Sequence, residues 1–320
     1  GNTTIFAPAK VITNIYQAEV RYPFDQVRSI RLSGGLRTDR LVVQSTEKVS
    51  LQFPDMNERY ALLRLEYVYD NTINPAINIW NGTRYKIYGD LNAQLTNGGL
   101  NELFNGPSSA AAQGRFTYNW GIDIRHYEKI YRNFIWATRF AMDMSWGTRK
   151  LLYYLGGVDN WLNPQINTNT LVNPSENYAF QTLSENLRGY KQNARNGNNV
   201  MLLNTELRLP VFATFIEKPI NSAFLRNFQL TSFMDIGTAW NKKLSFKDAN
   251  YTTYSNANNM NNATVVTRIK EGFLGPFVGG YGFGARTTIA GYFLRVDAGW
   301  PAVAFFRGSP IWYFAMGVDF

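Results

Sequence analysis

The chain has 320 residues, a net charge of +9, no cysteine and an aromatic content of 15%. Charged residues make up only 17% of it, below the roughly 25% of soluble domains, and it has no run of about 18 apolar residues, so no transmembrane helix is predicted. The basic residues are scattered and form no cluster, which argues against a nucleic-acid partner. High aromatic content without a long apolar run is typical of a membrane β-barrel, whose apolar residues stand at alternate positions.

After an irregular start at residues 1–11, the first half of the chain alternates apolar and polar residues with a period of two, which indicates β-strands. The clearest predicted strand covers residues 85–95. Turns are predicted at 23–26 and near 127–130, and a loop rich in Gly, Asn and Ser at about 97–113. The strands are longer than the about five or six residues usual in a soluble sandwich and long enough to cross a membrane when tilted.

The second half of the chain begins with a long insertion at residues 148–198, followed by two strands that each carry one carboxylate. An Asn-rich loop is predicted at about 241–276, and three final strands at about 278–290, 292–301 and 310–320. The total is 11 predicted strands. Because the insertion is rich in Asn, Gly and Ser, we expect it to bury little apolar surface.

The insertion carries the tetrapeptide Leu187-Arg188-Gly189-Tyr190, and the next two strands carry Glu206 and Asp235. Strand alternation places Glu206 on a polar face with Asn204 and Arg208. The planar guanidinium of an arginine can bind two carboxylates at once and keeps its charge. The sequence therefore predicts a loop that folds back into a barrel lumen, where Arg188 binds both acids.

These segments resemble the bacterial surface-antigen superfamily of BamA, TamA and FhaC. In that family a (V/L)RG(F/Y) tetrapeptide at the tip of the sixth extracellular loop enters the lumen. There it meets an inward acidic residue and the aspartate of an F-x-D-x-G motif. The resemblance implies that the matching residues of this chain hold the loop in place and are needed for function. They are Arg188, Gly189, Tyr190, Glu206, Asp235 and Gly237.

The resemblance implies an all-β fold, an antiparallel transmembrane β-barrel of which residues 1–320 form the C-terminal part. A family barrel has about 16 strands, so further strands would precede this chain. Since an open sheet would leave unpaired edges in lipid, we expect the missing N-terminal strands to come from the same or another chain. Otherwise an extra strand from residues 1–11 would close the sheet. The start at Gly1, without a methionine or signal peptide, indicates a mature or cleaved piece of a longer protein.

The shorter connections, including those with Pro23 and Pro210, are predicted on one side of the barrel and the longest loops on the other, as in barrels with short periplasmic turns. The last predicted strand ends on phenylalanine and resembles the C-terminal signal that directs the insertion of outer-membrane proteins. The residues of this signal are Trp312, Phe314, Met316, Val318 and Phe320.

The resemblance implies a protein of the bacterial outer membrane that inserts or assembles proteins there, or translocates them, without a cofactor. The implied partners are outer-membrane lipid and lipopolysaccharide, the missing barrel strands, and outer-membrane client or secreted proteins. The alternatives are an anchor or secretion pore for a fused N-terminal periplasmic or extracellular domain, and a plugged channel or porin. The sequence at residues 125–127 and 153–161 resembles that of Bacteroidota proteins that carry a TolB-like β-propeller before the barrel.

No catalytic or metal site is predicted, and we expect the protein not to be an enzyme. His126 is the only histidine, so neither a histidine triad nor a histidine-rich metal site is available. The glycines of residues 280–284 lack the spacing of a dinucleotide-binding loop. The inward carboxylates Asp90, Asp123 and Asp143 are expected to pair with inward Arg and Lys.

Overall fold

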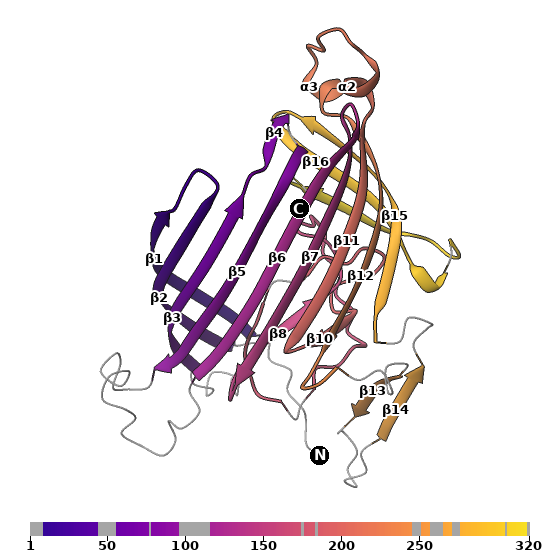
Figure 1. The fold of residues 1–320 in the computed structure, drawn as a ribbon. Helices are drawn as coiled ribbons and strands as arrows, with labels where there is room; N and C mark the ends of the chain where they lie inside the picture. The colour runs from indigo at the N-terminus through magenta and orange to yellow at the C-terminus, as the bar shows by residue number, and fades with distance from the viewer. Residues whose placement is uncertain are drawn as a thin grey trace.

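The computed structural model describes residues 9–43, 56–76, 78–95, 116–173, 176–182, 185–244, 251–256, 265–270, 276–304 and 306–318. Its main feature is one large, curved antiparallel sheet (Figure 1). Each strand pairs with the next along the path β1-β2-β3-β5-β6-β7-β11-β12-β15-β16-β17, and the short strand β4 pairs with β5. The predicted all-β antiparallel fold is confirmed, and this path contains the predicted number of strands.

The strands of the main sheet are β1 (Ala9–Pro23), β2 (Arg28–Val43), β3 (Met56–Asp70), β4 (Ile73–Ala76), β5 (Ile79–Leu95), β6 (Phe116–Tyr131), β7 (Phe134–Gly147), β11 (Asn199–Pro210), β12 (Gln229–Trp240), β15 (Val278–Ile289), β16 (Tyr292–Pro301) and β17 (Ile311–Met316). The remaining elements are β8 (Lys150–Leu155), β9 (Tyr178–Gln181), β10 (Arg195–Gly197), α2 (Val211–Phe215), α3 (Ala223–Arg226), β13 (Tyr251–Asn256), β14 (Val265–Lys270) and the short 3-10 helix η3 (Ala302–Ala304).

One face of the sheet is apolar and the other is polar. The apolar face points outward and the polar face inward, which is the reverse of the arrangement in a soluble protein. On β11, Leu203 and Leu207 are exposed on the outer face, whereas Glu206 and Arg208 are buried on the inner, concave face. Charged residues are almost never fully buried in soluble proteins. An apolar outer face around a polar interior is the arrangement of a membrane β-barrel, where lipid takes the place of the core. The alternation predicted from the sequence is therefore confirmed on this strand.

The sheet does not close on itself within the described residues, since β1 pairs with β2 and β17 pairs with β16, and the two end strands do not pair with each other. Residues 9–11, expected in an irregular start or an extra strand, are instead the first residues of β1. Among the described residues, no helix has the length and apolar character needed to cross a membrane.

The connections at one end of the strands are mostly tight, as at residues 24–27 and 290–291. The turn predicted near 127–130 is wrong, because β6 continues and the turn lies at 132–133. Tyr127 stays in the strand because it packs with Ile135 and Ala137 in a buried cluster. The connection after Pro210, also predicted to be short, contains α2 and α3 at this end of the sheet (Figure 1).

The last two predicted regions also differ in part. The final strand ends at Met316 rather than at 320, and Phe320 lies outside the described residues. Within the Asn-rich segment predicted as a loop, β13 and β14 pair with each other as a separate two-stranded sheet. The loop at about 97–113 lies outside the described residues.

The insertion at residues 148–198 has its own structure. Here β8 pairs with β10 and β9 in a small three-stranded sheet, and its side chains pack on β11 and β12. This cluster of buried residues contains Leu151, Tyr153, Leu155, Leu187, Val200, Leu202 and Ala239. The expectation that the insertion buries little apolar surface is therefore wrong, because β8 and Leu187 place their apolar side chains against the main sheet.

Candidate functional site

The pairing of β11 with β12 brings the two predicted carboxylates together. Asn204 lies opposite Asp235, and Glu206 lies opposite Phe233. Glu206 and Asp235 are therefore diagonal neighbours on the inner face, at a separation that long side chains can bridge. Both are fully buried.

Arg188 of the insertion reaches these two carboxylates. Its Nε donates a hydrogen bond to Oδ2 of Asp235 at 2.7 Å, and its Nη2 donates to Oδ1 at 2.8 Å, which makes a bidentate pair. Its Nη1 donates to Oε1 of Glu206, and its backbone amide donates to Asp235 at 3.0 Å. The guanidinium also lies 3.7 Å from the ring centre of Phe233, in a cation–π contact.

The charge network extends beyond the three predicted residues. Arg208 donates to Oε2 of Glu206 at 2.8 Å, Arg286 donates to Asp297 at 2.6 Å, and Asp297 lies 3.9 Å from the Arg188 guanidinium. Burial works to lower the pKa of Arg188, but the charges of Asp235 and Glu206 outweigh it and raise that pKa above its ordinary value. Three buried guanidinium groups thus face three buried carboxylates, so the charges balance.

The backbone at the loop tip requires a glycine. Gly189 has a φ of +92°, and a Cβ there would lie 2.5 Å from the carbonyl oxygen of Trp300 on β16. On β12, a Cβ at Gly237 would lie 2.9 Å from a carbonyl oxygen of β11 and 3.2 Å from Leu187. The tip therefore lies directly against the backbone of the wall, which fixes where Arg188 enters.

The loop tip also contacts the last strand of the sheet. The Tyr190 carbonyl accepts a hydrogen bond from the hydroxyl of the buried Tyr313 on β17. The ring of Trp161 lies 4.8 Å from the ring of Tyr313. At the edge of β17 that faces away from β16, the amide of Leu162 donates to the Phe314 carbonyl at 2.8 Å. The sequence reasoning missed these contacts, and no motif spacing signals them.

A second group of contacts ties the insertion to β7, the neighbour of β11 on the side away from β12. Arg139 of β7 donates to Glu185 at 3.2 Å and to Asp123 at 3.0 Å. The expected pairing of inward acids with basic residues holds at Asp123, and at Asp90 through Arg64. Asp143 instead accepts a hydrogen bond from a tyrosine hydroxyl, that of Tyr88.

The remaining predicted residues stay separate from this site. On β17, Trp312 and Phe314 are exposed on the outer face, with Met316 on the same face, and Val318 follows the strand. Their role as an insertion signal stays a prediction. His126 is exposed, and its Nδ1 lies 2.8 Å from the hydroxyl oxygen of Thr83. Among the described residues, no cluster of His, Cys, Asp or Glu is arranged to hold a metal ion.

An antiparallel sheet with an apolar outer face, a charged inner face and an inserted loop held by a buried arginine has the fold of an outer-membrane β-barrel of the BamA type. No family model and no curated protein matches the sequence. The structure is similar to BamA from Haemophilus ducreyi lacking POTRA domains 1–3, with a TM-score of 0.56 and 15% identity over 97% of this chain and 54% of that chain.

A second similar structure is CdiB from Escherichia coli, with a TM-score of 0.54 and 13% identity over 98% of this chain and 46% of that chain. The chain thus spans about half the length of these two proteins. At these identities the likeness establishes the fold, and the predicted resemblance to the BamA, TamA and FhaC type is confirmed at that level.

Proposed function

We propose that the chain is the C-terminal part of an outer-membrane protein of the BamA type, which takes part in inserting proteins into the outer membrane or translocating them across it. The observation that carries this proposal is the inserted loop, whose tip is held by Arg188 between Glu206 and Asp235 inside a fold of this type. The proposed location of the protein is the outer membrane of a Gram-negative bacterium, with lipid and lipopolysaccharide around the apolar face of the sheet.

The open sheet supports the proposal that other strands complete the barrel. Strand β1 ends the sheet with an edge that no described strand pairs, and the edge of β17 is covered only in part, by residues 160–162 of the insertion. Unpaired backbone groups cost several kcal/mol each in lipid. The missing strands come from the same protein or from another chain. The protein then works through strand pairing and binding of client or secreted proteins, rather than by catalysis or a cofactor.

The inserted loop also favours this function over a passive channel. Its small sheet and buried core occupy the concave face of the main sheet. A channel needs a continuous water-filled path, and a folded, ion-paired loop obstructs it. The remaining alternative, a barrel that anchors a fused domain such as a β-propeller, depends on the part of the protein that would precede these residues.

The test uses the full-length protein in its native host. We expect depletion of the protein to lower the amount of folded, heat-modifiable outer-membrane proteins or of secreted proteins, and the wild-type gene to restore it. Single-channel recording of the purified protein in planar bilayers provides the contrast. A large, steady conductance together with normal outer-membrane and secreted proteins after depletion would show a channel instead.

A further inference from the structure

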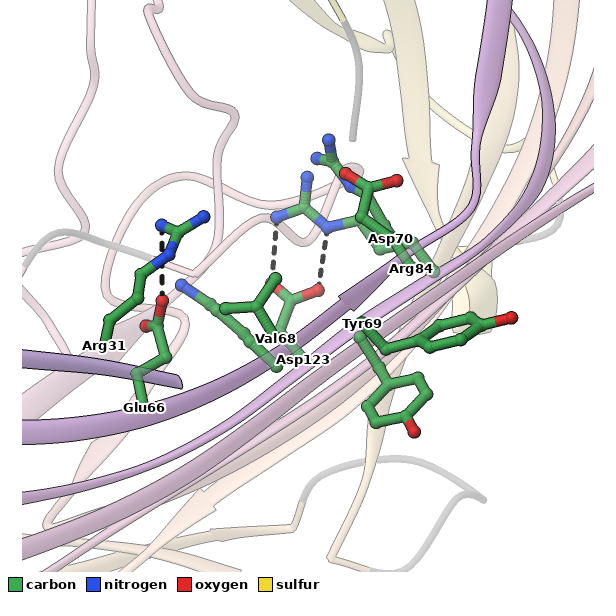
Figure 2. Close-up of a pocket in the computed structure, with 10 residues that line it drawn as sticks. Arg31, Glu66, Val68, Tyr69, Asp70, Arg84 and Asp123 are labelled. Carbon is green, nitrogen blue, oxygen red and sulfur yellow. Dashed lines mark hydrogen bonds and ion pairs between the residues drawn. The ribbon is translucent and has the colours of Figure 1, made fainter. Parts of the chain in front are cut away.

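A charged cleft of about 230 Å³ lies on the inner face of β2, β3, β5 and β6, strands other than those that hold Arg188. Figure 2 shows that Arg31, Arg84 and Asp123 lie on one side of the sheet, whereas the ring of Tyr69 points to the other side. The cleft therefore opens toward the lumen and not toward the apolar face. The charged residues that line it are Arg31, Glu66, Asp70, Arg84, Lys86, Asp123 and Arg125.

The carboxylates of the cleft are already engaged. Asp123 accepts hydrogen bonds from Arg125 at 2.7 and 2.8 Å and also from Arg139. Asp70 accepts from the amide and hydroxyl of Thr72 at 3.0 and 2.6 Å. Two guanidinium groups thus offset the charge of Asp123, whereas Asp70 keeps its negative charge because its donors are neutral. With four basic and three acidic side chains, the cleft keeps a net positive charge.

Two cations remain without a carboxylate partner in the described part of the chain. Arg84 and Lys86 lie near aromatic rings instead: the Arg84 guanidinium is 5.6 Å from the centre of the Trp80 ring, and the Lys86 ammonium is 5.5 Å from the centre of the Tyr88 ring. Arg31 is 3.6 Å from Glu66, and its buried Nε has no hydrogen-bond acceptor among the described residues. The cleft thus carries an excess of positive charge and an unused donor.

The strand register brings like charges together on one side of Arg84. Arg84 of β5 lies directly opposite Arg125 of β6, which lies directly opposite Arg139 of β7, while Asp70 of β3 lies on the other side of Arg84 and Asp123 lies opposite Lys86. Like charges directly opposite each other in a sheet destabilise it. The network around Arg188 has no such excess, because there three guanidinium groups face three carboxylates. An anion in the cleft would remove the imbalance.

We propose that this cleft binds a soluble phosphate-bearing anion, held by Arg84, Lys86 and Arg31. Arginine forks bind phosphate oxygens in pairs, and a lysine adds a mobile point charge. The lumen-facing position favours a soluble anion over a lipid phosphate, which would approach from the apolar face. This assignment does not depend on the proposed role in protein insertion.

The experiment measures binding of inorganic pyrophosphate to the purified full-length protein by calorimetry in a zwitterionic detergent. We expect binding that weakens with added salt, and that falls at least about tenfold in the double variant Arg84→Gln/Lys86→Gln, which loses two charge-assisted contacts. The matched control Lys129→Gln/Lys218→Gln removes two exposed charges outside the cleft and should stay within about twofold of the wild type.

Three results would overturn the proposal. One is no binding of pyrophosphate to the wild type, and another is an equal loss in both double variants, which would show general attraction to a basic protein. The third is competition by lipid. If pyrophosphate binds in phosphatidylcholine nanodiscs but not in phosphatidylglycerol nanodiscs, the cleft binds a lipid phosphate instead. Each variant is first checked for folding by its heat-modifiable migration in gel electrophoresis, which should equal that of the wild type. The single variant Lys86→Gln is a milder change that should also weaken binding while it keeps the fold.

Discussion

The hydroxyl of Tyr313 on the last strand joins that strand to the tip of the inserted loop. It accepts a hydrogen bond from the Gly189 amide at 2.8 Å and donates one to the Tyr190 carbonyl at 2.9 Å. The residue is fully buried. The loop tip is thus fixed both by the Arg188 ion pairs and by a neutral contact with β17, the strand at the edge of the sheet.

Tyr313→Phe removes this contact and keeps the ring. The buried Gly189 amide then loses its partner, so we expect the loop to become less stable by about 1–3 kcal/mol. The measurement is the rate of proteolysis within the loop in the purified full-length protein. Tyr292→Phe, at an exposed tyrosine of β16, is the control and should behave as the wild type. Equal protection in both variants would show that the hydroxyl is dispensable.

Arg188→Ala should release the loop and impair activity while the protein still inserts. Removing one partner of a buried ion pair costs about 3–5 kcal/mol, and here Glu206 and Asp235 would remain buried without their counter-charge. Arg188→Lys should restore function only in part, since an ammonium cannot form the bidentate pair. The measurements are loop proteolysis, surface expression and a growth or substrate-assembly assay.

The matched control for this substitution is Arg226→Ala, which removes an exposed arginine at the end of α3. It should leave loop protection and activity unchanged. Wild-type loop protection and activity in Arg188→Ala would contradict the central role that we assign to this arginine.

Leu155→Ala tests whether the core of the insertion supports the loop. Leu155 of β8 is fully buried in the cluster with Leu187 and Leu202, and a buried Leu→Ala change typically costs 2–5 kcal/mol, about as much as breaking the ion pair. We expect faster proteolysis of the loop, with migration of the barrel unchanged. Leu171→Ala, at an exposed position of the same insertion, is the control; similar proteolysis of both variants would show that the core contributes little.

Residues 1–320 produced alone should not form a stable closed barrel in detergent. No described strand pairs with the edge of β1, and the edge of β17 is covered only in part, by residues 160–162 of the insertion. Such edges invite pairing with other strands. We expect aggregation, or co-purification of an N-terminal fragment of the same protein when both are expressed. A monodisperse, heat-modifiable species made of residues 1–320 only would refute this expectation.

The sequence alone determined the fold class and the partners of Arg188. Strand alternation has a period of two, so the faces of Leu203, Glu206 and Asp235 follow from position along each strand. The motifs then indicated which acids the arginine meets. These features are local, or carried by recognisable segments, and the structure places the three residues together as the sequence analysis expected.

Only the tertiary structure decided the rest of the site. Asp297 and Tyr313 join it because β15, β16 and β17 follow β12 in the sheet, and the register that brings these strands to the tip of a loop more than 100 residues away leaves no signal in a single sequence. The same holds for the turn after β6, where the packing of Tyr127 on Ile135 carries the strand past its expected end. The core of the insertion was missed for a related reason: β8 is one short apolar run in a segment otherwise rich in Asn and Gly, and it forms a core only when it packs against β11 and β12.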